Sequence, residues 1–280
     1  MNALPVRMLA LCLTLAPALA AQPPAEPPKP SVTPESKPAE KASPTVAERL
    51  AASAKVYASA KTYRDDGLVV SEMDVQGRTI TSNLPFETAF ERGGRFRWQF
   101  RHSATPGAAP DQRYTIWSAD GESFNSFWTL TGAKKEDMDI SGAIAGPTGV
   151  SGGAATAIIP MLRVSPGGSR WGGRTTDIED PADKGQEATD GVQCRKIEGT
   201  ERFSNGKVTL WIDDAGLIRK IRQERTIDPS KLPKEAMKGR EPGPKFSTVT
   251  TITIKPVINE AKIDDVKFAP NEKNADGPEK

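Results

Sequence analysis

From Tyr63 to about residue 257, apolar and polar residues alternate, and this period of two constrains the fold more than any other feature. Such alternation places successive side chains on opposite faces of an extended strand. It predicts strands in two groups, at 63–75, 79–91, 95–102, 112–119 and 122–131, and then at 174–180, 190–200, 206–213, 217–227 and 246–257. Because short glycine-containing turns such as Gln76-Gly77 and Asp120-Gly121 join neighbouring strands, we expect an antiparallel meander.

Helices are expected in two places. Ser43 resembles an N-cap and Pro44 a first helical residue, for a helix that runs to about Lys61. Residues 141–163 are rich in glycine and alanine and end in an apolar run, which predicts one or two short helices covering the sheet. This is little cover for so long a sheet. A curved sheet with bulky apolar residues inside and little covering material is the usual construction of a ligand cavity.

The first twenty residues predict a signal peptide, cut after Ala20. Arg7 is followed by a short apolar run and then by the small residues before the expected cleavage point. The run is too short to span a bilayer comfortably, and no later stretch has transmembrane length. We therefore expect a soluble protein exported to the periplasm. Cys12 raises lipid anchoring as an alternative, although Leu11 stands where that signal requires a small residue.

The remaining chain divides by composition into a tether, one domain and a tail. Residues 21–44 are rich in proline, alanine, glutamate and lysine and predict a disordered tether. The domain is expected at 45–270, with a loop insertion at 228–245 that contains four prolines and has a mobile lid as its alternative. Residues 271–280 are expected to form a disordered tail.

The segment "FERGGRFRWQF", at 90–100, interleaves arginine with aromatic residues and raises the question of nucleic-acid binding. Strict alternation puts Phe96, Trp98 and Phe100 on one face and Arg95, Arg97, Gln99 and Arg101 on the other, with most of the arginines of the segment expected to face water. Nucleic-acid binding needs arginines and stacking rings on one surface. The formal charge is +2, and removal of Arg7 would leave 37 basic and 36 acidic residues. A nucleic-acid partner is therefore excluded.

The sequence gives weak support for an enzyme. Gly149–Gly153 matches the G-x-S-x-G pattern by letter, but the only histidine, His102, lies upstream, which excludes a serine hydrolase of that chain order. One histidine and one mature cysteine, Cys194, make no transition-metal site of ordinary spacing, and no cofactor is predicted. We attribute paired carboxylates to turns and strand ends: Asp65-Asp66, Asp213-Asp214 and Asp264-Asp265. A hydrolase with two converging carboxylates stays as a third hypothesis.

Four short motifs in order resemble the LolA/LolB-like lipoprotein carriers over about 45–270. Phe90 to Trp98 resembles the carriers' aromatic-x-Arg-Pro-x-x-Phe-x-Trp strand pair, with Gly93 in place of the proline. "WSADGESFNSFW" (117–128) resembles their Ser-Asp-Gly turn and aromatic strand, and "TLWIDDAGLIRKI" (209–221) their late hairpin. Val266–Pro270 resembles their closing Phe-x-Pro segment.

The resemblance implies a mainly β (α+β) fold, an unclosed antiparallel half-barrel of about eleven strands with helices covering an apolar cavity. It implies binding of acyl chains, as lipid or as acylated lipoprotein. By position, Arg92 matches the arginine that holds the carriers' lid closed through bonds to lid backbone. The expected cavity residues are Phe86, Phe90, Arg92, Phe96, Trp98, Phe100, Trp117 and Trp128.

Two functions are consistent with these patterns. The leading hypothesis is a non-enzymatic periplasmic binding or carrier protein for an acyl-chain-bearing amphiphile. The alternative is a structural or partner-binding envelope module, or stress sensor, on the same fold with a filled core, for which an envelope protein would be the partner.

Overall fold

The computed structural model describes residues 43–101, 113–162, 175–202, 206–231 and 243–260, together with Ile263 and Phe268. The chain divides into two units, Met1–Ala42 and Ser43–Lys280, and every described residue belongs to the second. The expected signal peptide and almost all of the tether therefore lie outside the described residues. So do the tail, His102, most of the 228–245 insertion and most of the Val266–Pro270 motif.

The N-terminal helix, α1 (Val46–Ser59), begins two residues later than predicted. Its N-cap is Thr45 rather than Ser43, because Thr45 and Glu48 form a capping box that satisfies two free backbone N–H groups. The Thr45 hydroxyl accepts from the Glu48 N–H at 3.3 Å, and the Glu48 carboxylate accepts from the Thr45 N–H at 2.8 Å. The helix buries Leu50, Ala54 and Tyr57 along one face.

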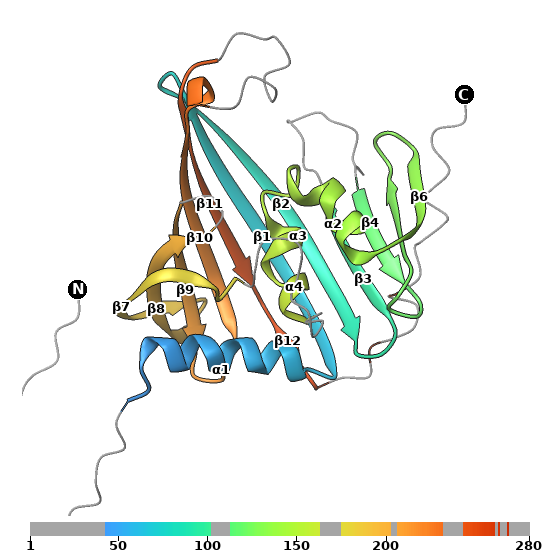
Figure 1. Cartoon of the computed structure of the whole chain (residues 1–280), viewed down its shortest axis with the longest axis horizontal. Helices are drawn as coiled ribbons and strands as arrows, with labels where there is room; N and C mark the ends of the chain where they lie inside the picture. The colour runs from blue at the N-terminus through green and yellow to red at the C-terminus, as the bar shows by residue number, and fades with distance from the viewer. Residues whose placement is uncertain are drawn as a thin grey trace, which may run out of the picture. The chain divides into compact units, whose positions relative to one another are not determined.

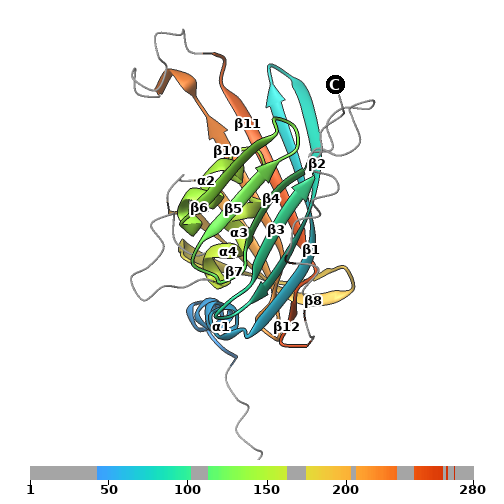
Figure 2. The same cartoon turned by 90° about the vertical axis from the view of Figure 1, so that its right-hand side faces the viewer.

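A single antiparallel sheet makes up most of the domain, in the order β6-β5-β4-β3-β2-β1-β11-β10-β9-β8-β7, with β12 also paired to β1. Among the described residues no pairing joins β6 to β7, so the sheet is unclosed (Figures 1 and 2). The predicted unclosed half-barrel of about eleven strands is confirmed. The strands are β1 (Thr62–Val75), β2 (Arg78–Glu91), β3 (Phe96–Arg101), β4 (Arg113–Ser118), β5 (Phe124–Trp128), β6 (Ala133–Met138), β7 (Ile178–Thr189), β8 (Val192–Glu201), β9 (Lys207–Asp213), β10 (Ile218–Ile227), β11 (Phe246–Ile254) and β12 (Val257–Ile258).

Short helices cover the concave face of this sheet. The predicted helical patch contains three, α2 (Ile140–Thr148), α3 (Ala154–Ala157) and α4 (Ile159–Leu162), and a 3-10 turn, η1 (Pro229–Lys231), follows β10. Figures 1 and 2 show the strands curving around α2, α3 and α4, while α1 lies across one end of the sheet. The main hydrophobic core forms between these helices and the concave face.

The two edge strands are where prediction from the sequence was wrong. Residues 133–138 form β6 but were not predicted as a strand, and β7 runs over 178–189 rather than 174–180. Both strands are mostly exposed and rich in charged residues, so neither has the apolar alternation that marks a half-buried strand. Strand β7 also shifts register twice, at Glu179/Ala182 and at Asp183/Gln186.

Glycines allow the core to pack closely at three places. A Cβ atom added at Gly67 of β1 would overlap the ring of Phe86 on β2. At Gly146 of α2 it would lie 2.7 Å from the Tyr114 hydroxyl, and at Gly152, before α3, it would lie 2.8 Å from a Val69 methyl. The helical segment therefore rests directly on the side chains of the sheet.

Replacement of Gly67 by alanine should destabilise the domain by about 1–3 kcal/mol, because the added methyl has no room beside the Phe86 ring. Gly94→Ala is the matched control, since a Cβ there meets only the Ala119 carbonyl, at 4.0 Å. Chemical denaturation of the two variants measures the difference. Equal stabilities would show that the Phe86 ring is not held over Gly67.

Candidate functional site

Aromatic side chains form a continuous layer on the concave face. The β2–β3 register pairs Phe86 with Phe100 and Phe90 with Phe96, and all four are buried. Trp98, between Phe96 and Phe100 on β3, is fully buried as well. Ring contacts extend this layer across the sheet, with centroid distances of 5.5 Å for Trp98–Phe100, 6.0 Å for Phe100–Tyr114 and 6.1 Å for Tyr114–Trp128.

Trp117 lies on the opposite, convex face. It alternates along β4 with the buried residues Ile116 and Ser118, and the register pairs it with Arg97. The structure therefore separates Trp117 from the other aromatic residues predicted to line a cavity, among which Trp128 is half-buried on the concave side.

The convex face of β3 contains a buried polar side chain, Gln99. Its side-chain oxygen accepts from the Arg97 guanidinium at 2.7 Å and from the Thr115 hydroxyl at 3.2 Å. Because the buried amide oxygen has partners, this face tolerates a polar residue without water.

Arg92 connects the β2–β3 turn to two of the covering helices. Its Nε donates to the Ala60 carbonyl at 2.7 Å, and one Nη donates to the Tyr57 carbonyl at 3.2 Å, both at the C-terminus of α1. The same Nη donates to the Leu162 carbonyl, the last residue of α4, at 3.0 Å. A guanidinium is suited to this role because it has five donors in a fixed planar arrangement. Partial burial lowers the pKa of Arg92.

The backbone of the same turn differs from what a proline would allow. Gly93 has a φ of +81°, whereas proline is fixed near −65°. The left-handed backbone conformation at position 93 is therefore one that glycine adopts and that a proline at this position could not. Next to it, the Arg95 guanidinium lies 5.0 Å from the centroid of the Phe268 ring and donates to Glu91 at 2.6 Å.

A buried carboxylate, Asp65, lies within the otherwise apolar concave layer. Its side chain is 1% exposed and accepts a 2.6 Å hydrogen bond from the Tyr63 hydroxyl. Burial raises the pKa of Asp65 to about 7, the negative charge of Asp66 adds to this rise, and hydrogen bonding by Tyr63 and Thr88 opposes it. The sequence interpretation placed Asp65-Asp66 among turns and strand ends, whereas Asp65 lies inside β1 and faces the core.

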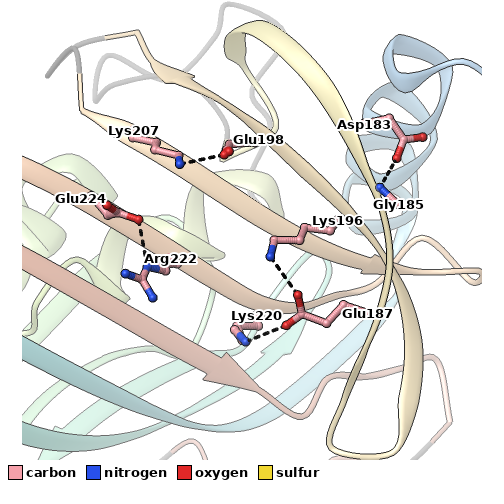
Figure 3. A network of polar contacts seen from close by, with 9 residues as sticks. All are labelled: Asp183, Gly185, Glu187, Lys196, Glu198, Lys207, Lys220, Arg222 and Glu224. Carbon is pink, nitrogen blue, oxygen red and sulfur yellow. Dashed lines mark hydrogen bonds and ion pairs between the residues drawn. The ribbon is translucent and has the colours of Figure 1, made fainter.

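The convex face of β7–β10 carries pairs of oppositely charged side chains (Figure 3). Glu187 lies 2.8 Å from the Lys196 ammonium and 3.6 Å from that of Lys220. Both ammonium groups stand over the Trp211 ring, 5.1 and 4.0 Å from its centroid. Such partly exposed pairs each contribute about 0–1 kcal/mol, so they mainly solvate this face.

Two further features bear on the kind of site present. Within the described ranges, no group of three histidine, cysteine, aspartate or glutamate residues gathers as a metal site would require. None of the helices described is both long and apolar enough to cross a membrane.

No family model matches the chain, and no curated protein matches it, but solved structures do. Lipoprotein LppX of Mycobacterium tuberculosis is 13% identical and aligns over 79% of this chain and 98% of its own, with a TM-score of 0.41. A LolA superfamily protein from Nitrosomonas europaea is 11% identical over 82% of this chain and 99% of its own, with a TM-score of 0.30. MucB, in complex with MucA(peri), is 13% identical over 81% of this chain and 61% of its own, with a TM-score of 0.39.

The chain thus has an unclosed antiparallel sheet with helices across its concave face, which is the architecture that the sequence motifs led us to expect. Because the TM-scores lie below 0.5 and the identities are 13% or lower, the ligands and partners of these proteins carry no argument for this chain. The strand register and the contacts of the chain itself carry that argument.

Replacement of Asp65 by asparagine should change how stability depends on pH. The ordinary carboxyl pKa of 3.8 is raised to about 7 in the fold, so the protonated side chain contributes stability below pH 4 that is lost as the pH rises toward 7. Asparagine has no such proton. The stability of the wild type minus that of the variant should therefore fall between pH 4 and 7, by up to about 1.4 kcal/mol per pH unit. Denaturation at several pH values tests this, and parallel curves would contradict it.

Proposed function

We propose that this protein is a non-enzymatic binding or carrier protein for an acyl-chain-bearing amphiphile. The observation that carries the proposal is the set of three hydrogen bonds from Arg92, which hold the ends of α1 and α4 against the β2–β3 turn. These helices cover the apolar concave face, and one side chain can release both.

The physical basis is an exchange of one apolar cover for another. While the helices lie on the sheet, their side chains keep water from the aromatic layer. If they move away, an acyl chain can take their place and gains about 0.8 kcal/mol for each methylene that it buries. The helices lose similar contacts when they move, so only the difference between the two appears as affinity.

The short helices suit such a movement. Helices α3 and α4 have four residues each, and α2 has nine. Segments of this length are not stable alone and depend on packing for their structure. We therefore expect their displacement to cost less than the displacement of a long helix would.

The buried polar groups favour binding over catalysis. Among the described residues the buried carboxylates are Asp65 and Asp213. Asp213 accepts from the Arg219 guanidinium at 2.7 Å and from the Leu217 N–H at 2.8 Å, which is a structural role beside the β9–β10 turn. The register places Asp213 opposite Cys194, on the face of β9 away from Leu210 and the core. Asp65 and Asp213 thus project from opposite faces of the sheet, and this arrangement gives no support to a hydrolase with two carboxylates in one cleft.

The proposed location is the periplasm, supported by the signal-peptide pattern of residues 1–20. There the ligand would be a lipid or an acylated lipoprotein. The tether at 21–44 would then act as a spacer ahead of the domain.

A second function is favoured by the close packing at Gly67, Gly146 and Gly152, where sheet and helices already fill the space between them. A core that stays filled would make the domain a partner-binding envelope module. The two functions differ in one measurable respect, because only the carrier takes up a chain.

Arg92→Leu should accelerate both uptake and release of a fluorescent fatty-acid probe about tenfold, because it removes the hydrogen bonds to Tyr57, Ala60 and Leu162. Arg101→Leu is the matched control, since Arg101 is an exposed arginine at the end of β3. Stopped-flow fluorescence gives both rates. Equal rates in wild type and Arg92→Leu would contradict the role of Arg92.

Native mass spectrometry of protein purified from its own periplasm should show bound lipid. Loss of that added mass after delipidation, and its return on incubation with lipid, would support a reversible carrier. A clean protein mass combined with no response to the fluorescent probe would overturn the carrier and leave the partner-binding module.

A further inference from the structure

One row of the sheet, running across the strands, carries polar groups through the centre of the aromatic layer. The β1–β2 register pairs Asp65 with Thr88, and the β2–β3 register pairs Thr88 with Trp98. We call Asp65, Thr88 and Trp98 the polar row. All three are almost fully buried, at 1%, 3% and 0% exposure. They face the same side as Phe86 and Phe90, so this row interrupts an apolar surface.

The two ends of the polar row have unsatisfied hydrogen-bonding groups. Tyr63 donates to one carboxylate oxygen of Asp65, and Thr88 makes a weaker contact with the carboxylate, but the other oxygen, Oδ1, has no hydrogen bond of ordinary geometry among the described residues. The indole N–H of Trp98 also lacks an acceptor there. A buried polar group without a partner costs about 1–3 kcal/mol, so native proteins rarely keep two in one place.

Other tryptophans do not share this arrangement. The indole N–H of Trp128 also has no acceptor among the described residues, whereas the Trp211 side chain is hydrogen-bonded to Glu187. Trp128 belongs to a different row, opposite Tyr114, and Trp211 is on the convex face beneath two lysines. Among the residues that the structure describes, only the polar row brings an unpaired carboxylate oxygen and an unpaired indole N–H to one line of the concave face.

We infer that the polar row is a subsite for the polar end of a neutral acylglycerol, with a glycerol hydroxyl donating to Asp65 Oδ1 and the ester carbonyl accepting from Trp98 Nε1. This inference rests on the proposed carrier function and names its ligand class. The ligand would enter when α1 and α4 leave the turn at Arg92, and its chain would lie along the aromatic layer.

The chemistry of the row selects against charged headgroups. A fatty-acid anion would have to bring its negative charge into an apolar layer, at a large desolvation cost whether Asp65 is protonated or ionised. An amine could pair with Asp65 but would offer nothing to the Trp98 N–H, which only donates. A glycerol ester is uncharged and has a hydroxyl donor that only one methylene and the ester oxygen separate from its carbonyl acceptor. The Cα atoms at the ends of the row are two strand spacings apart, about 9–10 Å, which these side chains and one glycerol unit can span together.

Three ligands with the same chain length separate the two contacts. The first, 1-oleoylglycerol, has a hydroxyl and an ester carbonyl, methyl oleate has the carbonyl only, and 1-octadecene has neither. Their affinities are measured by displacement of a fluorescent probe from the full mature chain. In the wild type we expect each added group to tighten binding about tenfold.

Each of two variants should abolish the gain in affinity that one of the two polar groups provides. Asp65→Leu should abolish the gain from methyl oleate to 1-oleoylglycerol and keep the gain from 1-octadecene to methyl oleate. Trp98→Phe should do the reverse. Trp128→Phe, a tryptophan on the same face but outside the polar row, should keep both. Because each variant is judged by ratios between ligands, a general loss of stability does not imitate the result.

The outcomes separate the subsite from the carrier function. Equal affinity of the wild type for all three ligands would overturn the subsite. It would leave a carrier that binds acyl chains without specificity for the headgroup. Ratios that survive in Asp65→Leu and Trp98→Phe would also overturn it. Binding of none of the three would overturn the carrier function and the subsite with it.

Discussion

The structure depends on one constraint. An unclosed sheet cannot shield its own apolar concave face from water, so other parts of the chain must cover that face. A closed barrel would supply its own cover by pairing its first and last strands. Here β6 and β7 do not pair within the described part of the chain, so four helices provide the cover and their attachment becomes decisive. Arg92 attaches two of them, α1 and α4, with three hydrogen bonds, and it does so from a turn within the most aromatic segment of the sequence.

Much of the fold could be predicted because most strands are half-buried. In β1 to β5 and β8 to β11, one face is covered and the other is solvated, so apolar and polar residues alternate along the sequence. The predicted ranges agree with these strands to within a few residues. Strands β6 and β7 could not be found in this way, because a strand exposed on both faces has no such difference. The start of α1 was predicted two residues too early, because Glu48 completes a capping box with Thr45 and so makes Thr45, not Ser43, the N-cap.

The site was harder to predict, because residue type and residue position carry different information. Aromatic character suggested that Trp117 belonged with Trp98, but which face it occupies depends on its place in β4, opposite Arg97. Asp65 was grouped with its neighbour Asp66 as an acidic pair. The alternation of Tyr63, Asp65 and Val69 along β1 already places Asp65 on the apolar face, so that signal was present in the sequence. No sequence pattern indicates that Asp65 and Trp98 share a row, since this depends on the register of two hairpins.

The charged, irregular edges of the sheet also decide how the molecule meets other chains. An open sheet offers two rows of free backbone groups, onto which a strand from another molecule could add. The lysines and glutamate of β6 and the two register shifts of β7 make both edges poor templates for such growth. The two edges of the unclosed sheet therefore disfavour the addition of a strand from another molecule, although neither edge is closed by pairing within the described residues.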